Sequence, residues 1–311
     1  MNTPSNTQSN LAPGSPLESQ VIAPAAISAT RHMYWSLRRE LWENRSIYIG
    51  PMAAAAVFLV GFVINMVTMR RRIGASLLDP AQQHDLLATR YELSAALIMG
   101  TGLIVGVFYS LDALYGERRD RSILFWKSLP VSDLTTVLSK LTIPLVILPL
   151  LSFAISLATQ FIMLLLSSVI LLGSGVHIAA LWSQVSFFHV SFVLLYHLLT
   201  VHGLWYAPFY GWLLMVSAWA PRAPFIWAFL PPFVISGVEK IAFNTSHFLM
   251  LLQERLVGSG DAMEPQSAPK DFMATLIPHH FFSRPGLWIG LALAAVFLAA
   301  AVRLRRYQGP V

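Results

Sequence analysis

The chain has 311 residues, of which 56% are hydrophobic and only 12% are charged, so it carries more apolar surface than one soluble core can bury. Its net charge of +6 comes from Lys and Arg residues that often flank apolar runs, which favours contact with anionic lipid over binding of nucleic acid. The lack of cysteine excludes disulfides, thiolate metal sites and cysteine nucleophiles.

The N-terminal region changes character near residue 30. Residues 1–30 are rich in Ser, Pro, Asn and Ala and hold no Lys or Arg, which predicts a disordered cytoplasmic tail and not a signal peptide. Residues 31–46 mix aromatic and aliphatic side chains with arginines at roughly helical spacing. This pattern predicts an interfacial helix that lies along the membrane.

The first two predicted membrane spans cover residues 47–69 and 93–110. Both runs are almost free of charge and are close to the roughly 20 residues that a helix needs to cross a hydrocarbon core of about 30 Å. Gly100, Gly102 and Gly106 lie along the second run. Such small residues let membrane helices approach one another closely, so we expect a tight helix contact there.

A polar segment, residues 111–140, follows the second span. Charged residues run from Glu117 to Arg121, an apolar patch covers 123–126, and a turn is expected at Leu129-Pro130. Mixed charges beside aromatic side chains favour a protein-docking element. The alternative is an ordinary basic loop that is attracted to anionic headgroups.

Four further apolar runs complete a prediction of six spans, at residues 141–172, 187–219, 225–238 and 286–302. The third span exceeds one bilayer thickness and must tilt, project, or kink near Pro144 and Pro149. The fifth is shorter than a full span, and Pro231-Pro232 is expected to break it. An amphipathic stretch, residues 247–256, lies before the last span.

Six spans place both termini on one side of the membrane. That side carries more Lys and Arg than the other, although Arg70 to Arg72 fall on the opposite side. The positive-inside rule therefore predicts that both termini and the polar segment are cytoplasmic.

Residues that could carry chemistry are sparse. No Asp, Glu, Lys or Arg lies within the first four spans or the sixth, which weighs against an ion-coupled carrier. Signatures of helical zinc proteases, serine hydrolases and phosphate-binding loops are absent from the sequence, so we expect no catalytic residue and no bound metal. His189, His197 and His202 do not share one helix face, and structural roles suit them better than a metal or proton path.

The polar segment resembles part of the membrane subunits of ATP-binding-cassette exporters of the type-2 (ABC-2) permease family. Members typically carry an acidic residue, a small pair, an apolar stretch, a Pro followed by a small apolar residue and Ser, and then a Lys. Here Glu117, Ser122, the patch 123–126, Pro130-Val131-Ser132 and Lys140 fall at matching spacings.

The layout is similar to that family as well. The resemblance implies an all-α, polytopic permease domain over residues 31–311 with an interfacial helix, six transmembrane helices and a coupling helix between the second and third spans. Two positions depart from the family pattern. Arg121 stands where Gly is usual, and Arg119 stands where a second acidic residue is frequent, so the docking chemistry could differ.

The resemblance implies a permease subunit of an ATP-driven exporter in the bacterial inner membrane. It would bind no cofactor itself, form a homodimer or heterodimer with a second permease subunit, and contact a separate ATPase subunit that holds ATP and magnesium. The implied contact residues are Glu117, Arg118, Arg121, Ser122, Phe125, Trp126 and Pro130. The alternative function is a non-transporting membrane scaffold or sensor whose polar segment recruits a cytoplasmic partner.

Overall fold

The structure is a computed structural model that describes residues 29–73, 80–129, 131–170, 195, 198, 202–257 and 281–311. Every regular element in these ranges is helical. The elements are α1 (Ala29–Glu43), α2 (Ser46–Ile73), α3 (Pro80–Asp112), α4 (Tyr115–Arg119), α5 (Ile123–Ser128), α6 (Asp133–Thr142), the π-helical turn η1 (Ile143–Ile147), α7 (Leu148–Ile170), α10 (Gly203–Trp205), α11 (Ala207–Trp219), α12 (Pro224–Phe243), α13 (His247–Val257), the 3₁₀ turn η4 (Phe281–Ser283) and α15 (Pro285–Tyr307).

Within the described ranges, five helical stretches are long and apolar enough to cross a membrane: Ser46–Thr68, Leu93–Arg119, Asp133–Val169, Pro224–Phe243 and Pro285–Tyr307. The prediction of an all-helical, polytopic membrane protein is therefore confirmed. Much of the predicted span 187–219 lies outside the described residues, and its described end forms α10 and α11. A total of six spans stays a prediction, as does the state of the tail 1–28.

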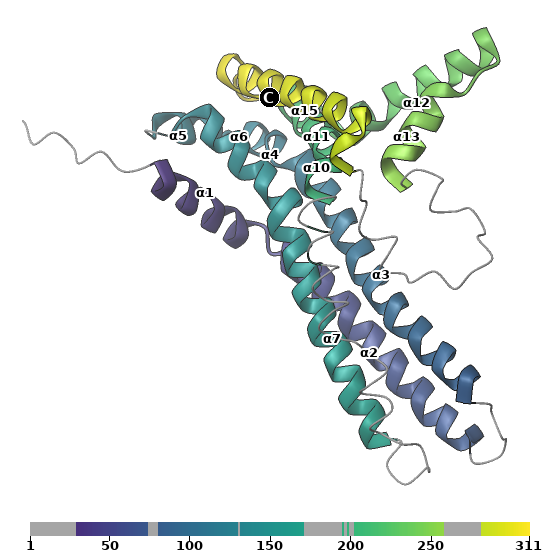
Figure 1. The fold of residues 1–311 in the computed structure, drawn as a ribbon. Coiled ribbons are helices and arrows are strands. Elements are labelled where there is room, and N and C mark those ends of the chain that lie inside the picture. Colours follow the sequence, from purple (N-terminus) through teal and green to yellow (C-terminus); the bar gives the residue numbers. More distant parts are fainter. Residues whose placement is uncertain are drawn as a thin grey trace, which may run out of the picture.

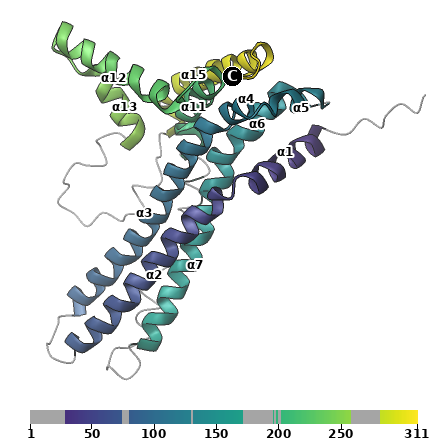
Figure 2. The ribbon, with the colours of Figure 1, turned by 180° about the vertical axis from the view of Figure 1, so that it is seen from behind.

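The helices form a long bundle with a cap at one end. Figures 1 and 2 show α2, α3 and α7 side by side along the bundle, with α11 and α15 packed together at its end. From that end α12 and α13 project as a helical pair, and α13 contains the predicted amphipathic stretch. At the same end α1 turns away from α2, and we refer to this bend as the elbow. The short helices of the polar segment lie at the same end as α1 and the C-terminal end of α15.

Close packing along α3 depends on two of the three predicted glycines. A Cβ atom on Gly102 would lie 2.9 Å from Cδ2 of Leu148 on α7, and one on Gly106 would lie 3.1 Å from the hydroxyl of Tyr210 on α11. Both distances are too short for comfortable contact, so larger residues would push the helices apart. The expectation of a tight contact is wrong for Gly100 among the described residues, none of which has an atom within 4 Å of a Cβ built there.

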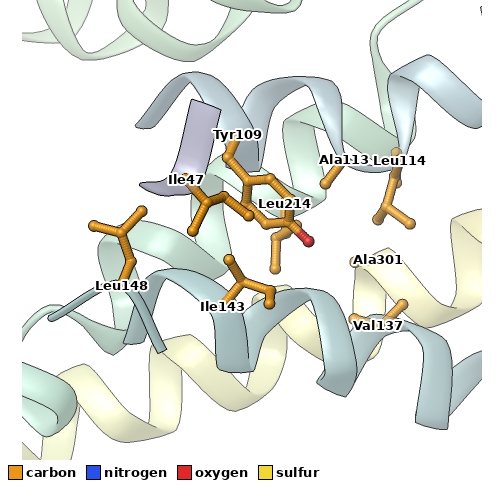
Figure 3. Packing of buried hydrophobic residues seen from close by; sticks show 10 residues of the cluster. Ile47, Tyr109, Ala113, Leu114, Val137, Ile143, Leu148, Leu214 and Ala301 are labelled. Carbon is orange, nitrogen blue, oxygen red and sulfur yellow. The ribbon is translucent and has the colours of Figure 1, made fainter. Parts of the chain in front are cut away.

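The main apolar core lies where the bundle meets the cap. Figure 3 shows Ile47 of α2 and Tyr109 of α3 close to Ile143, and the same cluster includes Leu214 of α11 and Ala301 of α15. Side chains from distant parts of the sequence pack against one another here, and such close packing holds helices together in a membrane protein. This core fixes the helices that carry the polar segment.

The third predicted span and the helix that precedes it form one helical stretch, α6–η1–α7, with a π-helical turn instead of a sharp break. Pro144 lies in this turn, where the amide of Leu148 donates to the carbonyl of Ile143. A proline in a helix lacks an N–H and crowds the preceding turn, and the wider π-helical geometry accommodates both effects.

The expected break at Pro231-Pro232 is wrong, because α12 continues through both prolines. A normal residue at position 232 would donate its amide to the carbonyl of Ala228, and proline cannot. The indole Nε1 of Trp212 on α11 donates to that carbonyl at 3.0 Å. A donor from a neighbouring helix thus replaces the missing backbone bond, which is how membrane helices tolerate proline.

Candidate functional site

Six charged side chains from four helices meet beside the polar segment. They are Arg39 and Glu40 of α1, Glu117 of α4, Asp133 and Lys140 of α6, and Arg305 of α15, and we refer to them as the ionic junction. These helices come together at the end of the bundle that carries the cap (Figure 1). The junction therefore connects the first and last described helices to the polar segment.

Glu117 is the centre of the ionic junction. Its Oε1 lies 3.2 Å from Nζ of Lys140 and accepts a hydrogen bond from Nη2 of Arg39 at 3.3 Å, while Oε2 accepts one from Nη2 of Arg305 at 3.2 Å. Arg305 also donates to the carboxylate of Asp133. The side chain of Glu117 is only 6% exposed, and a buried carboxylate is tolerated only when it is paired in this way.

Glu40 is the second buried carboxylate of the junction. It accepts hydrogen bonds of 2.8 Å from Nζ of Lys140 and of 2.8 Å from the hydroxyl of Tyr109 on α3. Glu40 and Glu117 face the equally buried cations Lys140 and Arg305, so the most buried part of the junction carries no net charge. This balance limits the cost of removing four charges from water.

Arg39 connects the junction to α5. Its guanidinium forms a 2.9 Å ion pair with Glu43 and lies 3.3 Å from the ring centroid of Trp126, a geometry that attracts the cation to the aromatic face. Burial alone would lower the pKa of Arg39, but the hydrogen bond with Glu43 and the carboxylates of Glu40 and Glu117 raise it above its usual value. Arg39 therefore stays charged.

Arg118 anchors α4 on α11. Its Nη1 donates to the carbonyl of Ala218 at 2.6 Å and to that of Ala220 at 3.1 Å, and its Nε donates to the carbonyl of Gly309 at 3.4 Å. The last carbonyls of a helix have no partner within it, and Arg118 supplies one for α11. This predicted contact residue is thus buried inside the chain.

Ser217 fixes the turn that leads from α3 into α4. Its hydroxyl accepts hydrogen bonds from the amides of Leu114 and Tyr115, at 3.0 and 2.9 Å, and donates to the carbonyl of Leu111 at 2.7 Å. The side chain is fully buried on α11. One hydroxyl thereby satisfies three backbone groups at the start of the polar segment.

The apolar patch of the polar segment divides between the inside and the outside of the molecule. Ile123 is buried, whereas Leu124 is 60% exposed and Phe125 is 59% exposed. Trp126 is half-buried under Arg39, and its ring meets that of Phe125 edge-on at 4.9 Å. The outer face of α5 therefore presents Leu124 and Phe125, with Trp126 holding it to α1.

Arg121 and Ser122 form the turn between α4 and α5. Arg121 is exposed and has a φ angle of 58°, in the left-handed region that favours glycine. Ser122 is half-buried, and its hydroxyl donates to the carbonyl of Glu117 at 3.5 Å. Pro130, the last predicted contact residue, lies outside the described residues.

Sequence reasoning named Glu117 and Lys140 as the two ends of one motif, and the structure brings them together. It missed Arg39 and Glu40 of the predicted interfacial helix, Asp133 within the polar segment, and Arg305 after the sixth predicted span, which complete the same ionic junction. Of the histidines considered as a metal or proton path, His189 and His197 lie outside the described residues. His202 packs its ring 4.7 Å from that of Tyr206.

No protein-family model, curated protein or solved structure significantly matches this chain. The family resemblance therefore rests on the motif and layout of the sequence alone. What the geometry adds is a contact between α5 and the ionic junction, in which Trp126 packs against Arg39.

Proposed function

We propose that the chain is the permease subunit of an ATP-driven exporter of the ABC-2 type, and that the outer face of α5 binds a separate ATPase subunit. One observation carries this proposal. A short helix with exposed Leu124 and Phe125 is attached, through Trp126, Arg39 and the ionic junction, to α1, α6 and α15. A displacement of α5 would therefore move these helices with it.

The two exposed apolar residues are expected to dominate affinity for the ATPase. Anchors of this size can each contribute about 2 kcal/mol or more at an interface, whereas exposed charge pairs contribute about 0 to 1 kcal/mol. Arg121 would then act mainly in orientation, and Trp126 would act by holding α5 against α1. Glu117, Arg118 and Ser122 support the contact face from within the chain.

A second permease subunit is part of this proposal. On α12 most of the large apolar side chains are exposed, and Ala228 is the buried residue of that helix. Such a surface requires lipid or another apolar helix. In this proposal both termini and α5 lie on the cytoplasmic side of a bacterial inner membrane. ATP and magnesium would be bound by the ATPase subunit alone.

The test is co-purification from native membranes with a tagged chain. We expect Leu124→Ala combined with Phe125→Ala to weaken retention of an ABC ATPase by at least about 30-fold, the equivalent of one lost anchor, and to abolish ATP hydrolysis coupled to the complex. Val57→Ala with Val60→Ala is the matched control, because it truncates two exposed apolar residues on α2, which takes no part in the proposed contacts with the ATPase or a second permease subunit.

An ATPase that is retained equally by both double variants would refute the contact at α5. Recovery of a kinase or another regulator in place of an ATPase would refute the exporter and support the scaffold or sensor. Membrane insertion, measured for all variants, separates loss of binding from loss of folding.

A further inference from the structure

A pocket of about 570 Å³ lies at the elbow between α1 and α2. It is lined by Leu41, Trp42, Arg45, Tyr48, Ile147 and Leu151. Leu41 and Trp42 lie at the end of α1, Arg45 lies in the connection between the two helices, and Tyr48 lies at the start of α2; the last two residues come from η1 and α7. This volume is within the range of small-molecule sites and is too small for a protein helix with its side chains.

The lining changes from polar to apolar with depth along the membrane helices. Arg45 and the 71% exposed Trp42 are at the elbow, where α2 is about to enter its apolar stretch. Ile147 and Leu151 lie further along, within the apolar part of the stretch Asp133–Val169. Trp and Tyr side chains prefer the headgroup level of a bilayer, which Tyr48 and Trp42 would both occupy.

The cation at the elbow is available to a ligand. Among the described residues, no acidic side chain pairs with the guanidinium of Arg45, and the residue is exposed. A second cation, Arg38, lies 5.4 Å from the ring centroid of Trp42. The polar end of the pocket therefore attracts negative charge, while its floor is the outer side of the main apolar core.

We propose that this pocket binds one anionic phospholipid, with its phosphate at Arg45 and an acyl chain against Ile147 and Leu151. The positive charge would face the lipid headgroup, the amphipathic rings would face the glycerol region, and the apolar floor would face the acyl tail. The pocket therefore presents these features in the same order as a phospholipid. A bound lipid would lie between α1 and α7 and would contact Leu41 and Trp42, which directly follow Arg39 and Glu40 of the ionic junction in the sequence. The inference does not depend on the proposed exporter function.

The experiment titrates the purified full chain with phosphatidylglycerol or phosphatidylcholine of identical acyl chains and counts retained lipids by native mass spectrometry. The chain should retain one phosphatidylglycerol about fivefold more tightly than phosphatidylcholine, which is the effect of one basic residue near an anionic lipid. Arg45→Gln should remove this preference. Arg303→Gln, which neutralises an exposed arginine at the same end of the molecule, should preserve it.

A second variant tests the apolar floor. Ile147→Trp should fill the pocket and reduce retention of both lipids, and if it fails to fold, Arg45→Gln alone decides. Equal retention of the two lipids by the unmodified chain, or an unchanged preference in Arg45→Gln, would overturn the proposal. Displacement of the lipid by glycerol phosphate would overturn it as well, since that would indicate a site for free phosphate.

Discussion

Glu117→Gln is the most direct test of the ionic junction. The change keeps the size of the side chain and some of its hydrogen bonds but removes the buried negative charge that faces Lys140, Arg39 and Arg305. Glu43→Gln is the matched control, because Glu43 pairs with the same Arg39 but its side chain is 50% exposed. Both variants therefore delete one carboxylate from the same group of cations.

The expected magnitudes differ because of burial. Breaking a buried ion pair costs about 3–5 kcal/mol when the remaining charge has no partner. Here Lys140 keeps Glu40, and Arg305 keeps Asp133, so we expect Glu117→Gln to lower the free energy of unfolding by about 3 kcal/mol, the lower end of that range. The exposed pair of Glu43 contributes about 0 to 1 kcal/mol.

The assay titrates the purified chain, held in a mild detergent, with a denaturing detergent and follows unfolding by tryptophan fluorescence. It gives the loss in free energy of unfolding for Glu117→Gln and for Glu43→Gln under one set of conditions. The double variant Glu117→Gln with Lys140→Gln completes a cycle, and residues in direct contact should show a coupling energy of about 0.5–3 kcal/mol. Equal, small losses for Glu117→Gln and Glu43→Gln, together with zero coupling to Lys140, would refute the buried junction.

Two further predictions concern the packing of the membrane helices. Gly102→Ala should lower the midpoint of thermal unfolding in detergent, because its new methyl group would collide with Ser152 and Leu148 on α7. Gly100→Ala would meet no described residue within 4 Å and should leave the midpoint unchanged or higher. Equal shifts for the two variants would contradict the α3–α7 contact. Trp212→Phe should destabilise α12 by about 1 kcal/mol by leaving the Ala228 carbonyl without its donor. Adding Pro232→Ala should restore that donor and reverse the loss in the same assay, and an additive loss would show that Trp212 acts in another way.

Much of the helical framework could be predicted from the sequence, because length and apolar composition alone determine which runs can cross a bilayer. The first span follows its predicted range closely, whereas the second and last begin where predicted but their helical stretches continue to Arg119 and Tyr307. The fifth, predicted to be shorter than a full span, is the 20-residue helix Pro224–Phe243. Pro231 and Pro232 could not be interpreted correctly in isolation, since their effect depends on Trp212, which lies on another helix. Local rules describe a helix in water, and neighbouring donors change the outcome.

The candidate site was only partly predictable for a similar reason. The motif placed Glu117 and Lys140 in one segment, but Glu40 and Arg305 are far from it in sequence, and only the fold brings them within 3.2 Å of these residues. Charges beside apolar runs usually mark the edge of the membrane, so nothing in the pattern distinguished these two from solvated neighbours. Likewise Arg118 belongs to a charged run but is buried against carbonyls.

The length of the third helical stretch has a consequence for the membrane itself. Its 37 residues, Asp133–Val169, extend over about 55 Å at 1.5 Å per residue, whereas lipid tails cover only about 30 Å. The end that carries Asp133 and Lys140 therefore stands clear of the tails, and a bilayer that thickens by a few ångströms would cover more apolar helix without reaching those charges. Along this one helix, a modest hydrophobic mismatch would therefore leave Asp133 and Lys140 outside the tails.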